Sequence, residues 1–250
     1  MKTFFDLAKS GKPAYGIYVG DTGECVAEMA AFAGFDYMRM DCEHTLSGSD
    51  TLRNLMRIAD AAGIPTLVRI STLNDITKLL DFGAKGILAP NIHTAQQAKE
   101  VVKWCKYHPM GERGIANIAR CYKFGATPTT EYLSKANSQV CVALNIESVQ
   151  GVNEIDRILE VEGVDIIAVG ALDLSQSMGH PGQTSHPDVV SAQNMIIEKT
   201  VAKGLIPLIT AGTAEQSKAL AQKGVYLQTI CFDTPFIMKQ FQSLISSFSG

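Results

Sequence analysis

Residues 34–45 read GFDYMRMDCEHT and contain the unit from which the fold of this chain is predicted. Gly34 closes a helix-like segment, residues 35–41 form a β-rich run, and polar residues follow that run directly. A glycine in this place is typical of a helix end in the left-handed conformation. A near-continuous apolar run is typical of a parallel strand buried on both faces. The stretch therefore predicts a helix end, a buried strand and a polar strand tip.

The same unit recurs along the chain. Gly63, Gly83, Gly204 and Gly224 stand at equivalent places before later runs. The segments between runs, such as TLRNLMRIADAAG and AQQAKEVVKWCKY, place apolar residues at helical spacing. The predicted strands are YGIYV (15–19), FDYMRMD (35–41), TLVRI (66–70), GILAP (86–90), VALNIE (142–147), DIIAVG (165–170), LIPLIT (205–210) and VYLQTI (225–230).

This strand–helix alternation over residues 1–250, without a linker or low-complexity segment, predicts one α/β domain, a (β/α)8 TIM barrel. An open doubly wound sheet is the alternative. It is disfavoured because no glycine-rich dinucleotide fingerprint follows the first run.

The composition excludes several classes of function. The chain is 46% hydrophobic with a formal net charge of −3, so it offers no basic face to nucleic acid or an anionic membrane. No segment approaches the roughly 20 apolar residues of a membrane span. The start, MKTFFDLAKSGKP, turns polar too early for a signal peptide, which predicts a cytoplasmic protein. The dispersed cysteines predict reduced thiols rather than disulfides or a zinc site.

Two acidic residues stand at the ends of adjacent predicted strands. In a barrel, catalytic groups come from the carboxyl ends of the strands, so Glu147 and Asp173 should lie side by side on one rim. Carboxylate oxygens with room for water suit Mg²⁺ or Mn²⁺. The alternatives are a helix cap at Asp173 and a solvated carboxylate at Glu147.

Three further residues at strand ends carry candidate chemistry. Arg69 could hold a ketone oxygen and stabilise negative charge on it, or form a structural ion pair. Asp41 and His44 could form a dyad, within a subunit or across an interface, in which the carboxylate orients the imidazole for proton transfer. The alternative for His44 is a loop histidine bonded to backbone. The other histidines have no carboxylate partner that spacing suggests, and are read as structural.

Covalent catalysis is less well supported. A Schiff-base aldolase needs a lysine near the end of an inner strand, and no predicted strand contains one. Lys85 precedes its strand, at the starting side. A phosphate site after the seventh or eighth strand has only a weak candidate, TAGTAEQ. Metal-dependent carbonyl chemistry is therefore favoured.

In their order along the chain, these residues resemble the HpcH/HpaI family of metal-dependent pyruvate aldolases, which have a phosphoenolpyruvate/pyruvate-type barrel. The resemblance extends from about residue 15 to residue 235. The matching segments are GFDYMRMDCEHT, GIPTLVRI, LDFGAKGILAPNIHTAQQAKEVV, GERG, YLSKANSQVCVALNIES and GVDIIAVGALDLSQSMGHPGQTSHPDV.

The resemblance implies a role for each matching residue. Glu147 and Asp173 would be the ligands of a divalent metal, Mg²⁺ or Mn²⁺, with Co²⁺ as a further candidate. Arg69 would hold the keto oxygen and stabilise the enolate. The pair of His44 and Asp41 would transfer protons through a bound water. The remaining matches would bind substrate: the backbone amides of Ala171 and Leu172, which cradle the pyruvate carboxylate, and Asn145.

The chain also departs from the family pattern. Asn145 replaces a glutamine, Ala171 and Ser71 replace prolines, and Arg39 replaces an apolar residue. These changes leave the metal ligands in place but bear on the second substrate. Arg39 could recognise another carboxylate or form an ion pair behind the barrel. We favour the ion pair.

The function implied is an aldolase that reversibly cleaves a 4-hydroxy-2-oxo acid into pyruvate and an aldehyde through a metal-stabilised enolate. One alternative is a citrate-synthase-like or other biosynthetic condensation at the same site, and another is a non-catalytic barrel that binds an oxo acid. The resemblance implies a homo-oligomer, a trimer or hexamer. The apolar stripe of FIMKQFQSLISSF (236–248) would pack on a neighbouring chain or equally on its own barrel.

Overall fold

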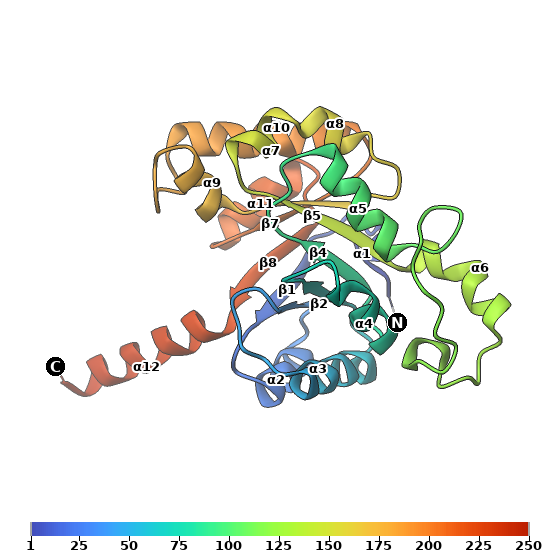
Figure 1. The fold of residues 1–250 in the computed structure, drawn as a ribbon. Coiled ribbons are helices and arrows are strands. Elements are labelled where there is room, and N and C mark those ends of the chain that lie inside the picture. The colour runs from blue at the N-terminus through green and yellow to red at the C-terminus, as the bar shows by residue number, and fades with distance from the viewer. Residues whose placement is uncertain (1, 250) are drawn as a thin grey trace.

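The computed structural model describes residues 2–249 and forms a closed barrel of eight parallel strands (Figure 1). Each strand pairs with the next along the chain, and β8 pairs with β1. The predicted (β/α)8 barrel is thereby confirmed. The strands are β1 (Ala14–Val19), β2 (Tyr37–Asp41), β3 (Thr66–Arg69), β4 (Gly86–Ala89), β5 (Cys141–Ile146), β6 (Ile166–Val169), β7 (Ile206–Thr210) and β8 (Leu227–Phe232).

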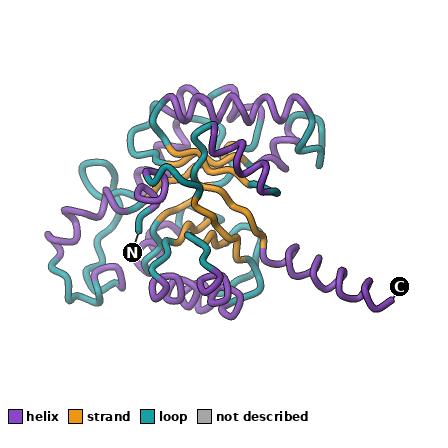
Figure 2. Tube along the Cα trace, turned by 180° about the vertical axis from the view of Figure 1, so that it is seen from behind, coloured by secondary structure: helices purple, strands orange, loops and turns teal. Residues whose placement is uncertain are grey.

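Most of the helices connect consecutive strands and lie around the outside of the barrel, whereas the first precedes β1 and the last follows β8 (Figure 2). The helices are α1 (Phe4–Lys9), α2 (Glu24–Ala33), α3 (Ser49–Ala62), α4 (Asp75–Phe82), α5 (Ala95–Cys105), the 3₁₀ helix η1 (Arg120–Tyr122), α6 (Thr129–Gln139), α7 (Val149–Asn153), α8 (Ile155–Leu159), α9 (Ala171–Ser177), α10 (Pro187–Ala202), α11 (Ala214–Gln222) and α12 (Asp233–Ser249). The glycines expected at helix ends all have positive φ, for example 91° at Gly34, which confirms the reading of that motif.

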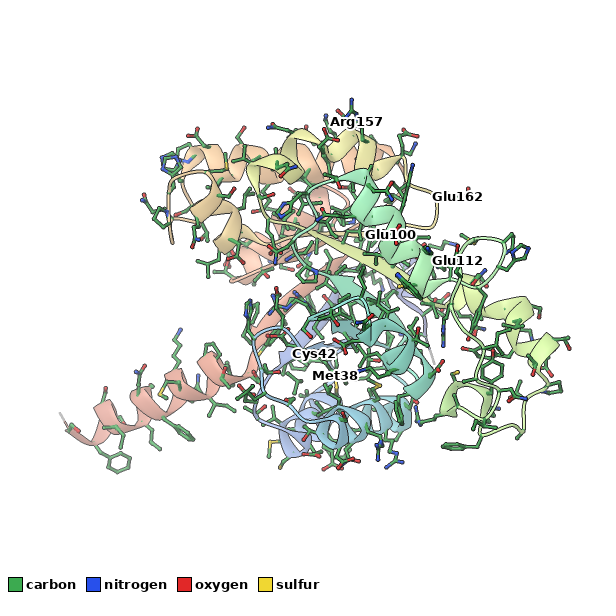
Figure 3. All side chains as sticks on the ribbon, viewed as in Figure 1. Met38, Cys42, Glu100, Glu112, Arg157 and Glu162 are labelled. Carbon is green, nitrogen blue, oxygen red and sulfur yellow. The ribbon has the colours of Figure 1, made fainter. Side chains whose placement is uncertain are left out.

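Strand β2 shows how side chains divide between the inside and the outside of the barrel. Met38 belongs to the apolar cluster that also contains Ala27 of α2 and Leu55 of α3, and Figure 3 shows it between the barrel and these helices. Tyr37 instead packs with apolar residues of other strands inside the barrel. Because successive side chains of a strand point to opposite faces, Arg39 and Asp41 share the inner face with Tyr37.

The amino-terminal end of the barrel is closed by packing. Tyr37 is fully buried, and the ring of Phe4 from α1 meets it edge-on at a centroid distance of 5.6 Å. Gly16 allows this closure, because a Cβ at that position would lie 2.2 Å from the Tyr37 ring. With this end filled, the barrel interior opens toward the carboxyl ends of the strands.

Helix α12 projects away from the barrel, as Figures 1 and 2 both show. Six of its apolar side chains are more than half exposed: Phe236, Met238, Phe241, Leu244, Ile245 and Phe248. The expectation that this stripe could pack equally on its own barrel is therefore wrong for the described chain. No helix among residues 2–249 has the length and apolar character to cross a membrane.

Candidate active site

Asp41 and Arg69 form a buried ion pair at the carboxyl ends of β2 and β3. The Nε atom of Arg69 donates to Oδ1 of Asp41 at 2.7 Å, and Nη2 donates to Oδ2 at 2.8 Å. This two-point geometry is the strong form of an arginine–carboxylate contact. Burial by itself would raise the pKa of Asp41, but hydrogen bonds from Arg69 and Tyr18 outweigh it and lower the pKa to about 2. Arg69 thus points inward and is also ion-paired, so its position is compatible with both interpretations, a group that holds a ketone oxygen and a structural ion pair.

Tyr18 on β1 is the third member of this cluster. Its hydroxyl donates to Asp41 and accepts from Nη2 of Arg69 at 3.2 Å. Burial, followed by the neighbouring Asp41 carboxylate, raises the pKa of Tyr18, so the phenol keeps its proton. Sequence reasoning missed Tyr18 because alternation along β1 shows which residues share a face but not which face points inward.

His44 does not contact Asp41 through its ring. The Asp41 carboxylate accepts the backbone N–H groups of Glu43 at 3.0 Å and His44 at 3.1 Å. The exposed imidazole lies nearest to Glu43, with 3.7 Å between His44 Nε2 and Glu43 Oε2. Oε2 of Glu43 also forms an ion pair with Nη1 of Arg69 at 3.1 Å, a role that sequence reasoning missed. The predicted dyad contact is absent within the chain, because the short turn directs the backbone rather than the ring of His44 toward Asp41.

Glu147 follows β5 and is 5% exposed. Its Oε1 atom accepts the backbone N–H of Asn91 at 2.6 Å, and Oε2 accepts the side-chain amide of Asn145. Burial, opposed by the Asn91 hydrogen bond and reinforced by the charges of Asp173 and Glu43, raises the pKa of Glu147 to about 7. Glu147 is thus a buried carboxylate among acidic neighbours rather than a solvated one.

Asp173 lies in the first turn of α9, which begins directly after β6. It is exposed, and it is the third residue of the helix rather than its cap, because Gly170 occupies the N-cap position. The backbone amides of Ala171 and Leu172 belong to the same turn, where N–H groups have no partner within the helix. The cap alternative for Asp173 is therefore not what the structure shows.

These acidic residues fit a divalent cation. A buried carboxylate beside other carboxylates is costly unless a positive charge neutralises it, and Glu147 stands in that situation next to Asp173. Oxygen ligands on two neighbouring elements, with open space on the solvent side, are what Mg²⁺ and Mn²⁺ use. Glu147 and Asp173 would be the ligands.

Gly170 packs directly against the proposed ligand. A Cβ at this position would lie 2.2 Å from Oε2 and 2.8 Å from Cβ of Glu147. We therefore expect Gly170→Ala to displace the Glu147 carboxylate and to lower metal-dependent activity about 10- to 100-fold, since a displacement near 1 Å costs up to about 10² in rate. Titration of activity against Mn²⁺ checks this. Gly114→Ala is the control for an added methyl group, because a Cβ there would meet no atom within 4 Å and the φ of Gly114 is not positive. Equal activity of wild type and Gly170→Ala would contradict the expectation.

The Asp41–Arg69 pair predicts a pH dependence of stability. The pKa of Asp41 is about 2 in the folded protein, below the usual value of an aspartate side chain. A depressed carboxyl pKa stabilises the fold above the unfolded pKa, and this stabilisation is lost as pH falls through about 4 toward 2. The shift corresponds to about 2 kcal/mol. We expect the difference in unfolding free energy between wild type and Asp41→Asn to stay constant from pH 8 to 5 and to shrink below pH 4, in urea titrations. A difference that does not change down to pH 3 would contradict this.

Other residues depart from what was expected. Arg39 forms no ion pair within residues 2–249, and it points into the barrel, so the prediction of an ion pair behind the barrel is wrong. His180 and His186 share the carboxylate of Asp188, at 3.4 and 3.7 Å, a pairing that spacing did not suggest. Nδ1 of His93 lies 2.7 Å from the hydroxyl oxygen of Ser148.

The fold and the site together define the class of protein, a (β/α)8-barrel enzyme whose acidic rim suits a divalent cation. The family model of HpcH/HpaI aldolase/citrate lyase matches residues 14–239. The chain belongs to this family, and the predicted class of enzyme, an aldolase, is confirmed with it.

Relatives and solved structures agree with this assignment. A 4-hydroxy-2-oxo-heptane-1,7-dioate aldolase of Shigella sonnei is 34% identical over all of this chain and 96% of its own length. The crystal structure of citrate synthase SbnG has a TM-score of 0.91 at 31% identity and covers 99% of this chain and 97% of its own. An HpcH/HpaI aldolase from Desulfitobacterium hafniense has a TM-score of 0.93 at 26% identity, with coverage of 99% and 97%.

Proposed function

We propose that the protein is a divalent-metal-dependent aldolase that reversibly cleaves a 4-hydroxy-2-oxo acid into pyruvate and an aldehyde. The observation that carries the proposal is the buried Glu147 carboxylate beside Asp173, on the same rim as the Arg69–Asp41 pair. The aldolase name of the Shigella sonnei relative, at 34% identity, supports the substrate class.

Glu147 and Asp173 would hold the metal ion, Mg²⁺ or Mn²⁺. When bound there, the cation would polarise the substrate's keto group and stabilise the negative charge that develops on it. Asn91 and Asn145 keep the Glu147 side chain in place through the two hydrogen bonds that it accepts. Whether the Asn145 amide also contacts substrate stays a prediction.

Arg69 would stabilise the enolate from the side of β3. A guanidinium has five N–H donors, and the hydrogen bonds to Asp41 and Tyr18 use three of them. The other two are on Nη1, which lies 3.1 Å from Oε2 of Glu43 and would donate to a substrate oxygen. The backbone N–H groups of Ala171 and Leu172 would donate hydrogen bonds to the substrate carboxylate at the start of α9.

The proton-transfer steps would take place at the mouth of the barrel. In the cleavage direction a base removes the proton of the C4 hydroxyl, the C3–C4 bond breaks, and its electron pair forms the enolate. A proton then adds to C3 and completes the methyl group of pyruvate. His44 would act as the base through a water molecule, because its exposed ring is free of Asp41 and lies beside Glu43.

Deuterium exchange tests this proposal directly. The protein is incubated with pyruvate and Mn²⁺ or Mg²⁺ in D₂O, and loss of the methyl proton signal is followed by NMR. We expect exchange that depends on the metal and is abolished by a chelator and by Asp173→Ala. No exchange with either metal would overturn the assignment of pyruvate as the nucleophile.

A second candidate function is a condensation of the citrate-synthase type at the same site. The likeness to citrate synthase SbnG, at 31% identity over nearly the whole chain, favours this candidate. Release of free coenzyme A from acetyl-CoA and oxaloacetate would support it. Aldol cleavage without any release of coenzyme A would decide for the aldolase.

We also propose that the protein is a homo-oligomer, a trimer or hexamer, in which α12 packs on a neighbouring chain. Phe241 and Ile245 lie one turn apart on the exposed stripe of this helix. We expect Phe241→Ser with Ile245→Ser to reduce the mass measured by light scattering to that of smaller species. The matched control is Gln242→Ser with Ser246→Ala on another face of the helix. A wild-type monomer, or an unchanged mass in the double variant, would contradict this proposal.

A further inference from the structure

Arg39 occupies an unusual position for a charged side chain. It lies in the middle of β2, on the inner face of the barrel, and only 9% of it is exposed. Its single hydrogen bond in the described chain runs from Nη1 to the hydroxyl of Thr229 on β8, at 3.2 Å. The Nε atom is buried and has no partner among residues 2–249.

Burying an unpaired guanidinium costs free energy unless another group pairs with its charge. Buried arginines are normally paired with a carboxylate, because a hydroxyl compensates little of the lost hydration of a full charge. The contrast with Arg69 is direct, since that guanidinium makes four contacts, three of them to carboxylate oxygens. Arg39 therefore has unused capacity to bind an anion.

The remaining exposed surface of Arg39 opens toward the mouth of the barrel. On the inner face of β2, the residue below it is Tyr37, which is fully buried, and Phe4 seals the barrel beneath that ring. The residue above it is Asp41, at the rim. The exposed part of Arg39 is therefore on the side of the barrel on which the proposed active site lies.

Arg39 also lies close to the proposed site. Its guanidinium carbon and that of Arg69 are each 5.8 Å from the centroid of the Tyr18 ring. Both guanidiniums therefore lie against the same Tyr18 ring, and a substrate held by Arg69 at one end has a second cationic group beside it. Arg69 is neutralised by Asp41 and Glu43, whereas Arg39 is not.

We propose that Arg39 is a specificity-determining residue of this site, which binds a second carboxylate of the substrate at the end away from the keto group and so sets the preference for a carboxylated over a neutral aldehyde. This inference rests on the proposed aldolase function, because that function defines how the substrate is oriented in the site. Arg39 acts in specificity and takes no part in proton transfer.

The first test compares matched aldehydes in the condensation with pyruvate. Glyoxylate is paired with acetaldehyde, and succinic semialdehyde with butanal, so that each pair differs in the carboxylate. For Arg39→Met we expect the ratio of kcat/KM between carboxylated and neutral aldehyde to fall about 10- to 100-fold, as for loss of a hydrogen-bonded charge pair. Arg39→Lys should retain part of the preference. An unchanged ratio would overturn the proposal.

The second test needs no turnover. Thermal unfolding of the metal-free protein is measured with succinate, with butyrate and with sodium chloride at equal ionic strength. We expect succinate to stabilise wild type and not Arg39→Met, since a ligand that binds only the folded state raises the Tm. Without ligand, Arg39→Met should melt at the same temperature or up to about 5 °C higher, because an unpaired buried charge is removed.

The outcomes separate this inference from the proposed function. A purely structural Arg39 would give a lower Tm in Arg39→Met and an equal response to succinate in both proteins, which would overturn the proposal. If wild type shows no pyruvate exchange but succinate stabilises it through Arg39, the aldolase function fails and the anion site stands. If exchange occurs but neither the ratio nor the succinate effect depends on Arg39, this inference alone fails.

Discussion

Glu147→Gln is expected to lower metal-dependent deuterium exchange of pyruvate by at least about 10³-fold, since it removes an anionic ligand while keeping the shape of the side chain. The same change should leave the metal-free protein equally stable or more stable. The reason is that a neutral amide replaces a charged carboxylate that is buried beside Asp173 and Glu43. The Tm measured with and without Mn²⁺ checks both parts, because the metal should stabilise wild type and not the variant.

Glu162→Gln is the matched control for this variant, because Glu162 is exposed on the outer surface of the barrel (Figure 3). It should retain the exchange activity and the stabilisation by Mn²⁺. Exchange in Glu147→Gln at the wild-type rate would remove the basis for a metal site at this rim. A strong loss of stability in the metal-free variant would instead show that the Glu147 charge supports the fold.

Arg69→Met is expected to destabilise the fold by about 3–5 kcal/mol, the usual cost of removing one partner of a buried ion pair. Asp41 is 1% exposed and would lose two charged donors at once. Pyruvate exchange should fall by at least about 10²-fold, because a donor to the developing enolate is lost as well. Urea unfolding and the NMR exchange assay measure the two effects separately.

The double variant Arg69→Met with Asp41→Leu separates the causes. It removes both charges, so it should recover much of the stability that the single variant loses while exchange stays low. Arg69→Lys keeps the charge but cannot donate to both oxygens of Asp41 in a planar arrangement, and should give an intermediate loss. A double variant no more stable than Arg69→Met would show that the cost does not come from the stranded carboxylate.

Much of the fold could be predicted because its signals are local. Each strand is a short apolar run, and the preceding helices close on glycines such as Gly34 and Gly63 whose φ is positive. The order of these apolar runs along the chain then implied the barrel. Asp41, Arg69 and Glu147 follow from it as candidates because they stand at the carboxyl ends of their strands, where the catalytic groups of such barrels lie. These residues follow from sequence alone because position along a strand decides which end they occupy.

What surrounds each of these residues was decided only by tertiary structure. A period of two shows that Tyr37, Arg39 and Asp41 share a face, but closure of the sheet determines that this face is the inside. The partner of Arg39, Thr229, lies 190 positions away on the strand that closes the barrel against β1.

The contacts of His44 and Tyr18 were hidden for the same reason. The turn after β2 directs the backbone of His44 to Asp41, and Tyr18 reaches that carboxylate from β1. The sequence by itself determined which chemical groups stand at the strand ends. The three-dimensional closure of the barrel decided which of them meet, and it left Arg39 facing inward with no carboxylate partner among residues 2–249. The reason is that contacts between strands far apart in sequence depend on how the sheet closes and not on local pattern.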